Sequence, residues 1–161
     1  METFRNYDPQ KAAKVNVEKP VISASADYHC DGSGYYRCDF WMPLLPPSVN
    51  HYVTHGGGFH RKSAEAKAFE RDFTLFNGGY SVNGERFHVT FKFFPGPKQK
   101  GDVDNRNKVL LDCIAKAGML RNFKGEELSD AWVKRLTVEI HDSDKDREQG
   151  PKTFVTIEAI G

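Results

Sequence analysis

The feature that most constrains the fold is a strand that runs into a charged loop and then into a helix. Large apolar side chains alternate with polar ones from Phe87 to Phe94, which predicts a half-buried β-strand. Pro95-Gly96-Pro97 ends this strand. From Asn105 onward, apolar residues recur at helical spacing, and Gly118 is a natural stop after them. The residues expected on the apolar face of this helix are Leu110, Ile114 and Ala117. The charged loop is therefore expected at one edge of a sheet.

Two carboxylates lie one residue apart in this loop, at Asp102 and Asp104. In an extended chain both point to one face, while Val103 points to the other. Two acids aimed together repel each other unless a proton or a cation lies between them, and Mg²⁺ prefers such oxygen ligands. Lys108 follows Asp104 by one helical turn. A simpler interpretation is a polar loop in which Asp104 caps the helix and pairs with Lys108, and these residues alone do not decide between the two.

The stretch Asp102-Val-Asp104-Asn-Arg-Asn-Lys108, followed by Leu111-Asp112 and Ala117-Gly118, resembles the core motif of the RusA family of Holliday junction resolvases. Three further matches stand in the expected order, namely Pro46-Pro47-Ser48-Val49-Asn50 before an aromatic pair, Ser63-Ala64-Glu65 at a helix start, and Asp130-Ala-Trp132. The resemblance spans about Trp41 to Ile160. It implies an α+β fold in which two main helices pack on a small mixed β-sheet, and it implies a homodimer.

The resemblance also assigns roles to four residues. It implies that Asp102, Asp104 and Asp130 bind Mg²⁺, as one ion or two. It implies that Lys108 stabilises the charge that develops on the phosphate or orients the attacking water. The resemblance therefore implies that catalysis depends on Asp102, Asp104, Lys108 and Asp130.

The match at Asp130 departs from the family pattern. Ser129 stands where the family has a first acid, and Trp132 replaces a glutamine. The loop before it also carries a few extra residues. Glu126 or Glu127 therefore remain alternatives for the third metal ligand.

Charge is distributed unevenly along a chain whose net charge is only +1. Residues 86–124 carry nine Lys/Arg and three Asp, a net charge of about +6, and residues 125–161 carry five Lys/Arg and nine Asp/Glu, about −4. The positive segment surrounds the paired acids and would raise the local concentration of a polyanion, although an ordinary solvated basic surface would look the same. The candidate DNA-binding residues are Arg61, Lys62, Lys98 and Lys100.

These features predict a Mg²⁺-dependent endonuclease that resolves four-way DNA junctions by symmetric cleavage of two opposed strands, in recombination and repair. Two alternatives stay open: a related metal-dependent nuclease for flaps or other branched DNA, and a non-catalytic DNA-binding module whose acids are structural. No phosphate-binding loop of the Gly-Lys-Ser/Thr type is present, so no nucleotide cofactor is expected.

The remaining sequence completes the expected organisation. Residues 1–34 are expected to be a loosely ordered N-terminal extension, with a break at Asp31-Gly-Ser-Gly34, and residues 35–161 the nuclease domain. Val15, Val17, Val21 and Ile22 are candidates for a short edge strand in that extension. Further strands are expected over residues 35–42, 133–140 and 153–160, and a helix after Ser63. Residues 51–62 are expected to form a Gly-rich loop, and residues 141–150 a charged hairpin loop.

Cysteine usage and hydropathy indicate the compartment. Cys30, Cys38 and Cys113 form no recognisable disulfide framework, which favours a reducing environment. Cys30 and Cys38, with His29 nearby, have the wrong spacing for a zinc knuckle. No apolar run approaches the roughly 20 residues of a membrane span. The expected location is the cytoplasm of a bacterial or phage-infected cell, with no membrane partner.

Overall fold

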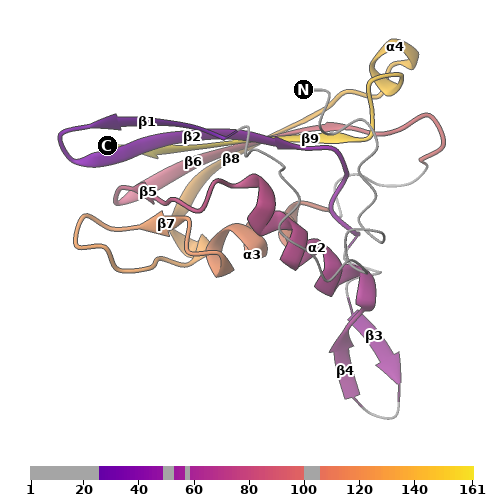
Figure 1. The fold of residues 1–161 in the computed structure, drawn as a ribbon, viewed down its shortest axis with the longest axis horizontal. Helices are drawn as coiled ribbons and strands as arrows, with labels where there is room; N and C mark the ends of the chain where they lie inside the picture. The colour runs from indigo at the N-terminus through magenta and orange to yellow at the C-terminus, as the bar shows by residue number, and fades with distance from the viewer. Residues whose placement is uncertain (1–25, 49–52, 57–58, 100–105) are drawn as a thin grey trace.

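The structure is a computed structural model that describes residues 26–48, 53–56, 59–99 and 106–161, with the backbone alone for residues 53–56 and 59–62 (Figure 1). It is an α+β fold with a mixed five-stranded sheet, two two-stranded sheets and two main helices. The elements in chain order are β1 (Asp27–Asp31), β2 (Gly34–Met42), β3 (Val53–Gly56), β4 (Phe59–Lys62), α2 (Ala64–Phe76), β5 (Val82–Asn83), β6 (Arg86–Phe94), α3 (Asn107–Lys116), β7 (Leu120–Arg121), η4 (Asp130–Trp132), β8 (Val133–Ile140), α4 (Asp144–Arg147) and β9 (Lys152–Ile160).

The five-stranded sheet has the order β1-β2-β9-β6-β8. Its neighbours are antiparallel except for β6 and β8, which run parallel. Parallel neighbours need a long connection, and here the chain crosses from β6 to β8 through α3. This crossing places the segment with the paired acids after the C-terminal end of β6. The strands expected at residues 35–42, 87–94, 133–140 and 153–160 are thus confirmed.

The core lies between one face of the sheet and the helices α2 and α3, which lie below the sheet in Figure 1. From β6, the side chains of Phe87, Val89, Phe91 and Phe93 point into it and are fully buried. Each such phenylalanine contributes about 1.5–3 kcal/mol through burial. The helix expected after Ser63 is confirmed, because the Ser63 hydroxyl accepts a hydrogen bond from the Ala66 amide.

The expected N-terminal extension does not reach residue 34. Residues 27–31 form β1, which pairs with β2 through a tight turn at Gly32-Ser33. The Tyr28 hydroxyl donates hydrogen bonds to the carbonyls of Asn77 and Tyr80, so β1 is also tied to the end of α2. The Gly-rich break in the sequence is therefore the turn of a hairpin. The edge strand considered between residues 15 and 22 lies outside the described residues.

Two further loop expectations were wrong. Residues 53–56 and 59–62, expected in a Gly-rich loop, form the antiparallel hairpin of β3 and β4, which projects from the start of α2 in Figure 1. Residues 141–150 are not a hairpin loop, because β8 and β9 are separated by β6 in the sheet. That connection instead contains α4. Local alternation identifies a strand, but it does not reveal which strand pairs with it.

Three residues expected in apolar faces are less buried than predicted. Leu136 and Ile140 of β8 are each 40% exposed, because β8 is the edge strand of the sheet and the helices do not cover its outer side. Ala117 is also exposed, since it is the C-cap of α3 and lies beyond the last buried turn. The buried face of α3 consists of Val109, Leu110, Cys113 and Ile114.

None of the helices in the described ranges has the length and hydrophobicity of a membrane-spanning segment.

The reactivity of the three cysteines toward an alkylating reagent tests the pairing of β1 with β2. Cys30 is exposed, Cys38 and Cys113 are buried, and burial raises the pKa of the Cys38 thiol to about 11. Because the thiolate is the reactive form, Cys38 should stay protonated and unreactive at pH 8. We expect iodoacetamide to label Cys30 quickly and the other two thiols only in denaturant, as measured by peptide mass spectrometry. Labelling of Cys38 at the rate of Cys30 would contradict the described register.

Candidate metal and nucleic-acid site

The segment with the paired acids joins the loop after β6 to the first turn of α3. Lys100, Asp102 and Asp104 lie outside the described residues, and the structure describes the two ends of the segment, Gln99 and Arg106. Within the described ranges, no three His, Cys, Asp or Glu side chains form a group able to bind a metal ion. Because two of the three expected ligands lie outside those ranges, the Mg²⁺ site remains a prediction.

Lys108 lies on the first turn of α3 with its side chain exposed. Asp112, one helical turn later, is within reach of a lysine at i−4. No ion pair joins these two residues in the part of the chain that the structure describes. The Lys108 ammonium is therefore not neutralised by Asp112 and remains able to meet an anionic ligand.

Asp130 is the first residue of η4, and its side chain is exposed. Ser129 caps this short helix by accepting a hydrogen bond from the Ala131 amide at 3.3 Å. η4 packs against α3, so the structure brings together the elements that carry Asp130 and Lys108. Among the described residues, the Asp130 carboxylate accepts no hydrogen bond and forms no ion pair.

The two alternative third ligands, in contrast, are already engaged. Glu127 Oε1 lies 3.1 Å from Nη2 of Arg121, and Glu126 Oε2 accepts a hydrogen bond from Nδ2 of Asn122 at 2.8 Å. Both carboxylates thus stabilise the turn between β7 and η4. Among the described residues, the Asp130 carboxylate has no such partner. Because exposed pairs of this kind add little stability, the identity of the third ligand stays a prediction.

Arg106 fixes the far end of the paired-acid segment, and sequence reasoning missed it. Its Nη1 donates a hydrogen bond to the Pro46 carbonyl, which ties the start of α3 to the Pro-Pro segment after β2. Burial lowers the pKa of Arg106, and the nearby charge of Glu65 opposes this shift. Its buried Nε has no hydrogen-bond partner among the described residues. Burying a guanidinium with an unsatisfied N–H reduces the stability of the fold. In the sequence, the only sign of this role was the position of Arg106 inside the motif.

Arg147 of α4 braces the near end of the segment. Its Nη1 donates to the carbonyls of Gly96 at 3.1 Å and Gln99 at 2.9 Å. Gly150 also packs closely here, because a Cβ added to it would lie 2.3 Å from the Pro95 carbonyl oxygen. The connection between β8 and β9 thus holds the loop that leads to the acids. Sequence reasoning placed Arg147 in a charged hairpin loop and gave no sign of this contact.

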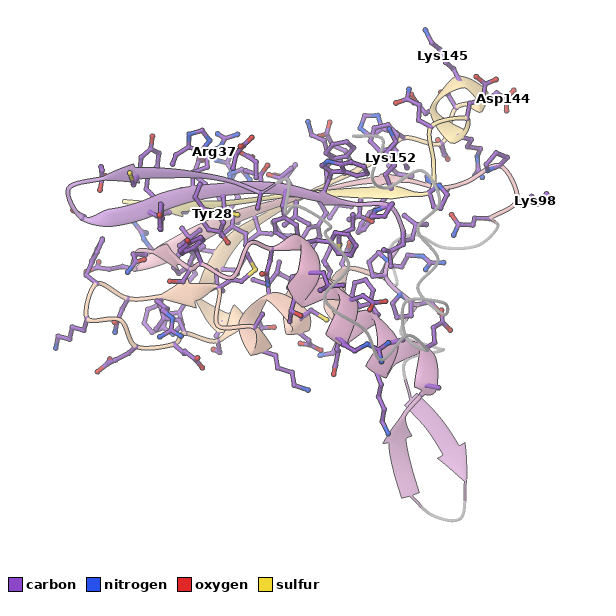
Figure 2. The ribbon with its side chains drawn as sticks, in the orientation of Figure 1. Tyr28, Arg37, Lys98, Asp144, Lys145 and Lys152 are labelled. Carbon is purple, nitrogen blue, oxygen red and sulfur yellow. The ribbon has the colours of Figure 1, made fainter. Side chains whose placement is uncertain are left out.

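The basic residues lie around the same region. Lys98 is exposed in the loop after β6 and points away from the sheet in Figure 2. Arg61 and Lys62 belong to β4, and nothing is described of their side chains. Because Glu65 of α2 lies near Arg106, the base of the β3–β4 hairpin adjoins the start of α3. Of the four expected DNA-binding side chains, the structure describes Lys98, so the basic surface stays a prediction.

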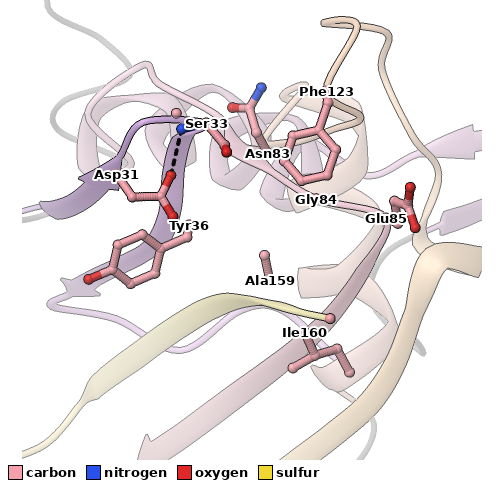
Figure 3. Close-up of a pocket in the computed structure, with 11 residues that line it drawn as sticks. Asp31, Ser33, Tyr36, Asn83, Gly84, Glu85, Phe123, Ala159 and Ile160 are labelled. Carbon is pink, nitrogen blue, oxygen red and sulfur yellow. Dashed lines mark hydrogen bonds between the residues drawn. The ribbon is translucent and has the colours of Figure 1, made fainter.

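A hollow lies at the opposite end of the sheet. It has a volume of about 240 Å³ and is lined in part by Tyr36, Phe123 and Ile160 (Figure 3). Asp31, which also lines it, accepts a hydrogen bond from the Ser33 amide at 2.7 Å. This hollow surrounds the N-terminal end of β6, whereas the paired acids follow the C-terminal end. It is therefore separate from the candidate site.

No protein-family model matches the chain, and no curated protein matches it, so the resemblance to the RusA family rests on the motif residues and their order.

Trp132 offers a way to identify the third metal ligand that does not depend on nuclease activity. Tb³⁺ prefers oxygen ligands, as Mg²⁺ does, and it luminesces when a nearby excited tryptophan transfers energy to it. Because Trp132 is in the same helical turn as Asp130, we expect Tb³⁺ bound to the wild-type protein to luminesce on tryptophan excitation, and Mg²⁺ to compete. Asp130→Asn should abolish most of the signal. Glu127→Gln is the matched control, and loss of the signal in that variant alone would move the third ligand to Glu127.

Proposed function

We propose that this chain is a Mg²⁺-dependent endonuclease that resolves four-way DNA junctions. The observation that carries the proposal is the packing of α3 against η4, which brings together the elements that carry Lys108 and Asp130. Asp102 and Asp104 precede α3 in the sequence. The order of these residues is that of the RusA motif. The α+β arrangement of the described chain agrees with the fold that the resemblance implies.

Asp102, Asp104 and Asp130 would hold Mg²⁺, since all three supply carboxylate oxygens and Asp130 has no competing partner within the described residues. A bound Mg²⁺ supplies an activated water and neutralises charge on the scissile phosphate. Lys108 would place its ammonium beside that phosphate, where it stabilises the additional negative charge of the transition state. Arg106 and Arg147 would hold the two ends of the acidic segment in place.

The DNA would approach across the basic residues that surround this segment. Lys98 and Lys100 precede the acids, and Arg61 and Lys62 lie on the hairpin that adjoins α3. Phosphate contacts of this kind position a duplex without reading its sequence. A homodimer would present two such sites, and its two-fold symmetry suits a four-way junction with two opposed scissile strands. The proposed location is the cytoplasm of a bacterial or phage-infected cell.

Cleavage assays with defined DNA structures test this function directly. We expect the protein to introduce paired, symmetric nicks into a four-way junction in Mg²⁺ and none in EDTA. Equal concentrations of labelled junction and flap in one reaction compare the two substrates, and we expect the junction to be cut faster. Faster cleavage of the flap would favour the branched-DNA nuclease. Junction binding without any cleavage in Mg²⁺ would indicate a non-catalytic module.

Replacing Lys108 distinguishes a contact made only in the transition state from a general contact to a phosphate. A contact made only in the transition state affects the rate once DNA is bound, whereas a flanking contact affects affinity. We expect Lys108→Ala to bind junctions with little loss but to cleave a preformed complex about 10²–10³ times more slowly in single turnover. Lys108→Arg should restore only part of the rate, because a planar guanidinium replaces a compact ammonium.

Lys116→Ala is the matched control for this comparison. Lys116 is on the last turn of the same helix and pairs with Glu70 at 3.1 Å, away from the first turn. It should leave the single-turnover rate unchanged. A wild-type rate for bound Lys108→Ala would show that Lys108 has no catalytic role.

A further inference from the structure

The face of the sheet opposite the helices carries a row of aromatic side chains at one end. Trp41 of β2 lies directly opposite Phe154 of β9 in the sheet. On its other side, Phe154 lies opposite Lys92 of β6. Phe40, Val155 and Phe93 point to the helices and are buried. Because side chains alternate along a strand, Trp41, Phe154 and Phe94 must point to the other face.

The rings in this row contact each other across the strands. The centroids of Trp41 and Phe154 are 6.2 Å apart with the planes inclined by 27°, and those of Phe154 and Phe94 are 5.6 Å apart, edge to face. Phe94 stacks on the imidazole of His141 at 4.4 Å with nearly parallel planes. We call these four residues the aromatic row. It crosses three strands and ends just beyond β8.

One lysine lies over the aromatic row. The Nζ of Lys152 is 5.7 Å from the ring centroid of Phe94 and 5.9 Å from that of Phe154. Figure 2 shows Lys152 on the face of the sheet that is opposite α2 and α3. Within the described residues Lys152 forms no ion pair with a carboxylate, so its charge is available to an anionic ligand.

A shallow groove runs along the sheet beside the row. It has a volume of about 330 Å³, and Trp41 and Phe154 form its apolar wall. Its remaining lining includes Thr90, Thr156, the cations Arg37 and Lys92, and the carboxylates Asp27 and Asp39. Arg37 pairs with Asp39 at 2.9 Å, and Lys92 pairs with Glu139 at 3.6 Å. The surface therefore combines half-buried rings, hydrogen-bonding groups and paired charges with the Lys152 ammonium, which has no carboxylate partner among the described residues.

We propose that the aromatic row binds unpaired bases of single-stranded DNA. Bases stack on aromatic side chains of a sheet surface, and this contact tolerates any sequence because every base has a π-face. Lys152 would contact the phosphate that joins two stacked bases, and the groove would receive a base edge. A paired base inside a duplex cannot reach a ring that lies on a sheet, so the row selects unpaired nucleotides.

The choice of DNA rests on the proposed function, because branched DNA exposes unpaired bases where its arms separate. The aromatic row lies at the end of the sheet where β6 passes into the Pro95–Gln99 loop, which leads to the paired acids. Bases held by the row would thus be on the same end of the molecule as the proposed scissile strand. The row itself needs no metal ion and no catalysis.

Tryptophan fluorescence tests the proposal directly. The chain has two tryptophans, so Trp132→Phe leaves Trp41 as the sole reporter. We expect a 20-residue oligo(dT) to quench this fluorescence in a saturable manner, and blunt duplex DNA to quench it far less. Phe154→Leu and Trp41→Leu, made in the wild-type chain, should each weaken oligo(dT) binding by roughly 5- to 100-fold in fluorescence anisotropy, the loss expected for one stacked base. Trp41→Phe should retain most of the affinity.

Phe123→Leu is the matched control, because Phe123 is an aromatic residue with 59% exposure at the other end of the sheet. It should bind oligo(dT) as wild type does, and thermal melting confirms that each variant is folded. Unquenched Trp41 at saturating oligo(dT), or equal affinities of the Leu variants and wild type, would overturn the proposal. So would tighter binding of oligo(rU), or a change of oligomeric state in Phe154→Leu, which would indicate RNA or a second copy. Because binding is measured in EDTA, failure of junction cleavage leaves this result unaffected.

Discussion

The parallel pairing of β6 with β8 is the constraint on which the rest of the molecule depends. Parallel neighbours cannot be joined by a tight turn, so the chain must leave the end of β6, cross the sheet and return to the start of β8. α3 makes that crossing, and its buried face covers the phenylalanines of β6. The entry into α3 must therefore begin beyond the end of β6. The sequence places its paired acids in that entry, and the return path carries Asp130 back against α3.

Two arginines hold the ends of this long connection in place through hydrogen bonds to backbone carbonyls. Arg147 binds carbonyls before the acidic segment, and Arg106 binds the Pro46 carbonyl after it. Backbone carbonyls fix position without adding a negative charge, so these contacts hold Gln99 and Arg106 at the two ends of the segment without a further carboxylate. Carboxylate partners would have given stronger attraction but would also have altered the charge of the site. The partly unsatisfied Arg106 guanidinium is the cost of this arrangement.

Sequence patterns predicted the elements of this fold better than their pairing. The alternation in β6 and the Ser63 cap are local signals, and both elements lie where expected. The hairpin of β1 and β2 was missed because Asp31-Gly-Ser-Gly34 was interpreted as a break in the structure. β8 and β9 were wrongly expected to pair as a hairpin, because alternation does not reveal which strands are neighbours in the sheet. For the site, the motif assigned Lys108 and Asp130, and the structure shows that the elements carrying them pack together. Arg147 could not be found, because its contacts join residues about fifty positions apart.

The exposed charges of the candidate site differ from the ion pairs found elsewhere on the described chain. Several cations there face carboxylates, as in the pairs Arg37–Asp39, Lys116–Glu70 and Arg121–Glu127. Such exposed pairs add little stability, and their fields largely cancel a few ångströms away. Asp130 and Lys108 take part in no such pair among the described residues, so the field of each extends into solvent. An anionic carboxylate attracts a cation and a free ammonium attracts a phosphate. Asp130 on η4 and Lys108 on α3 thus suit a ligand with one positive and one negative part, such as a metal ion bound to a phosphodiester.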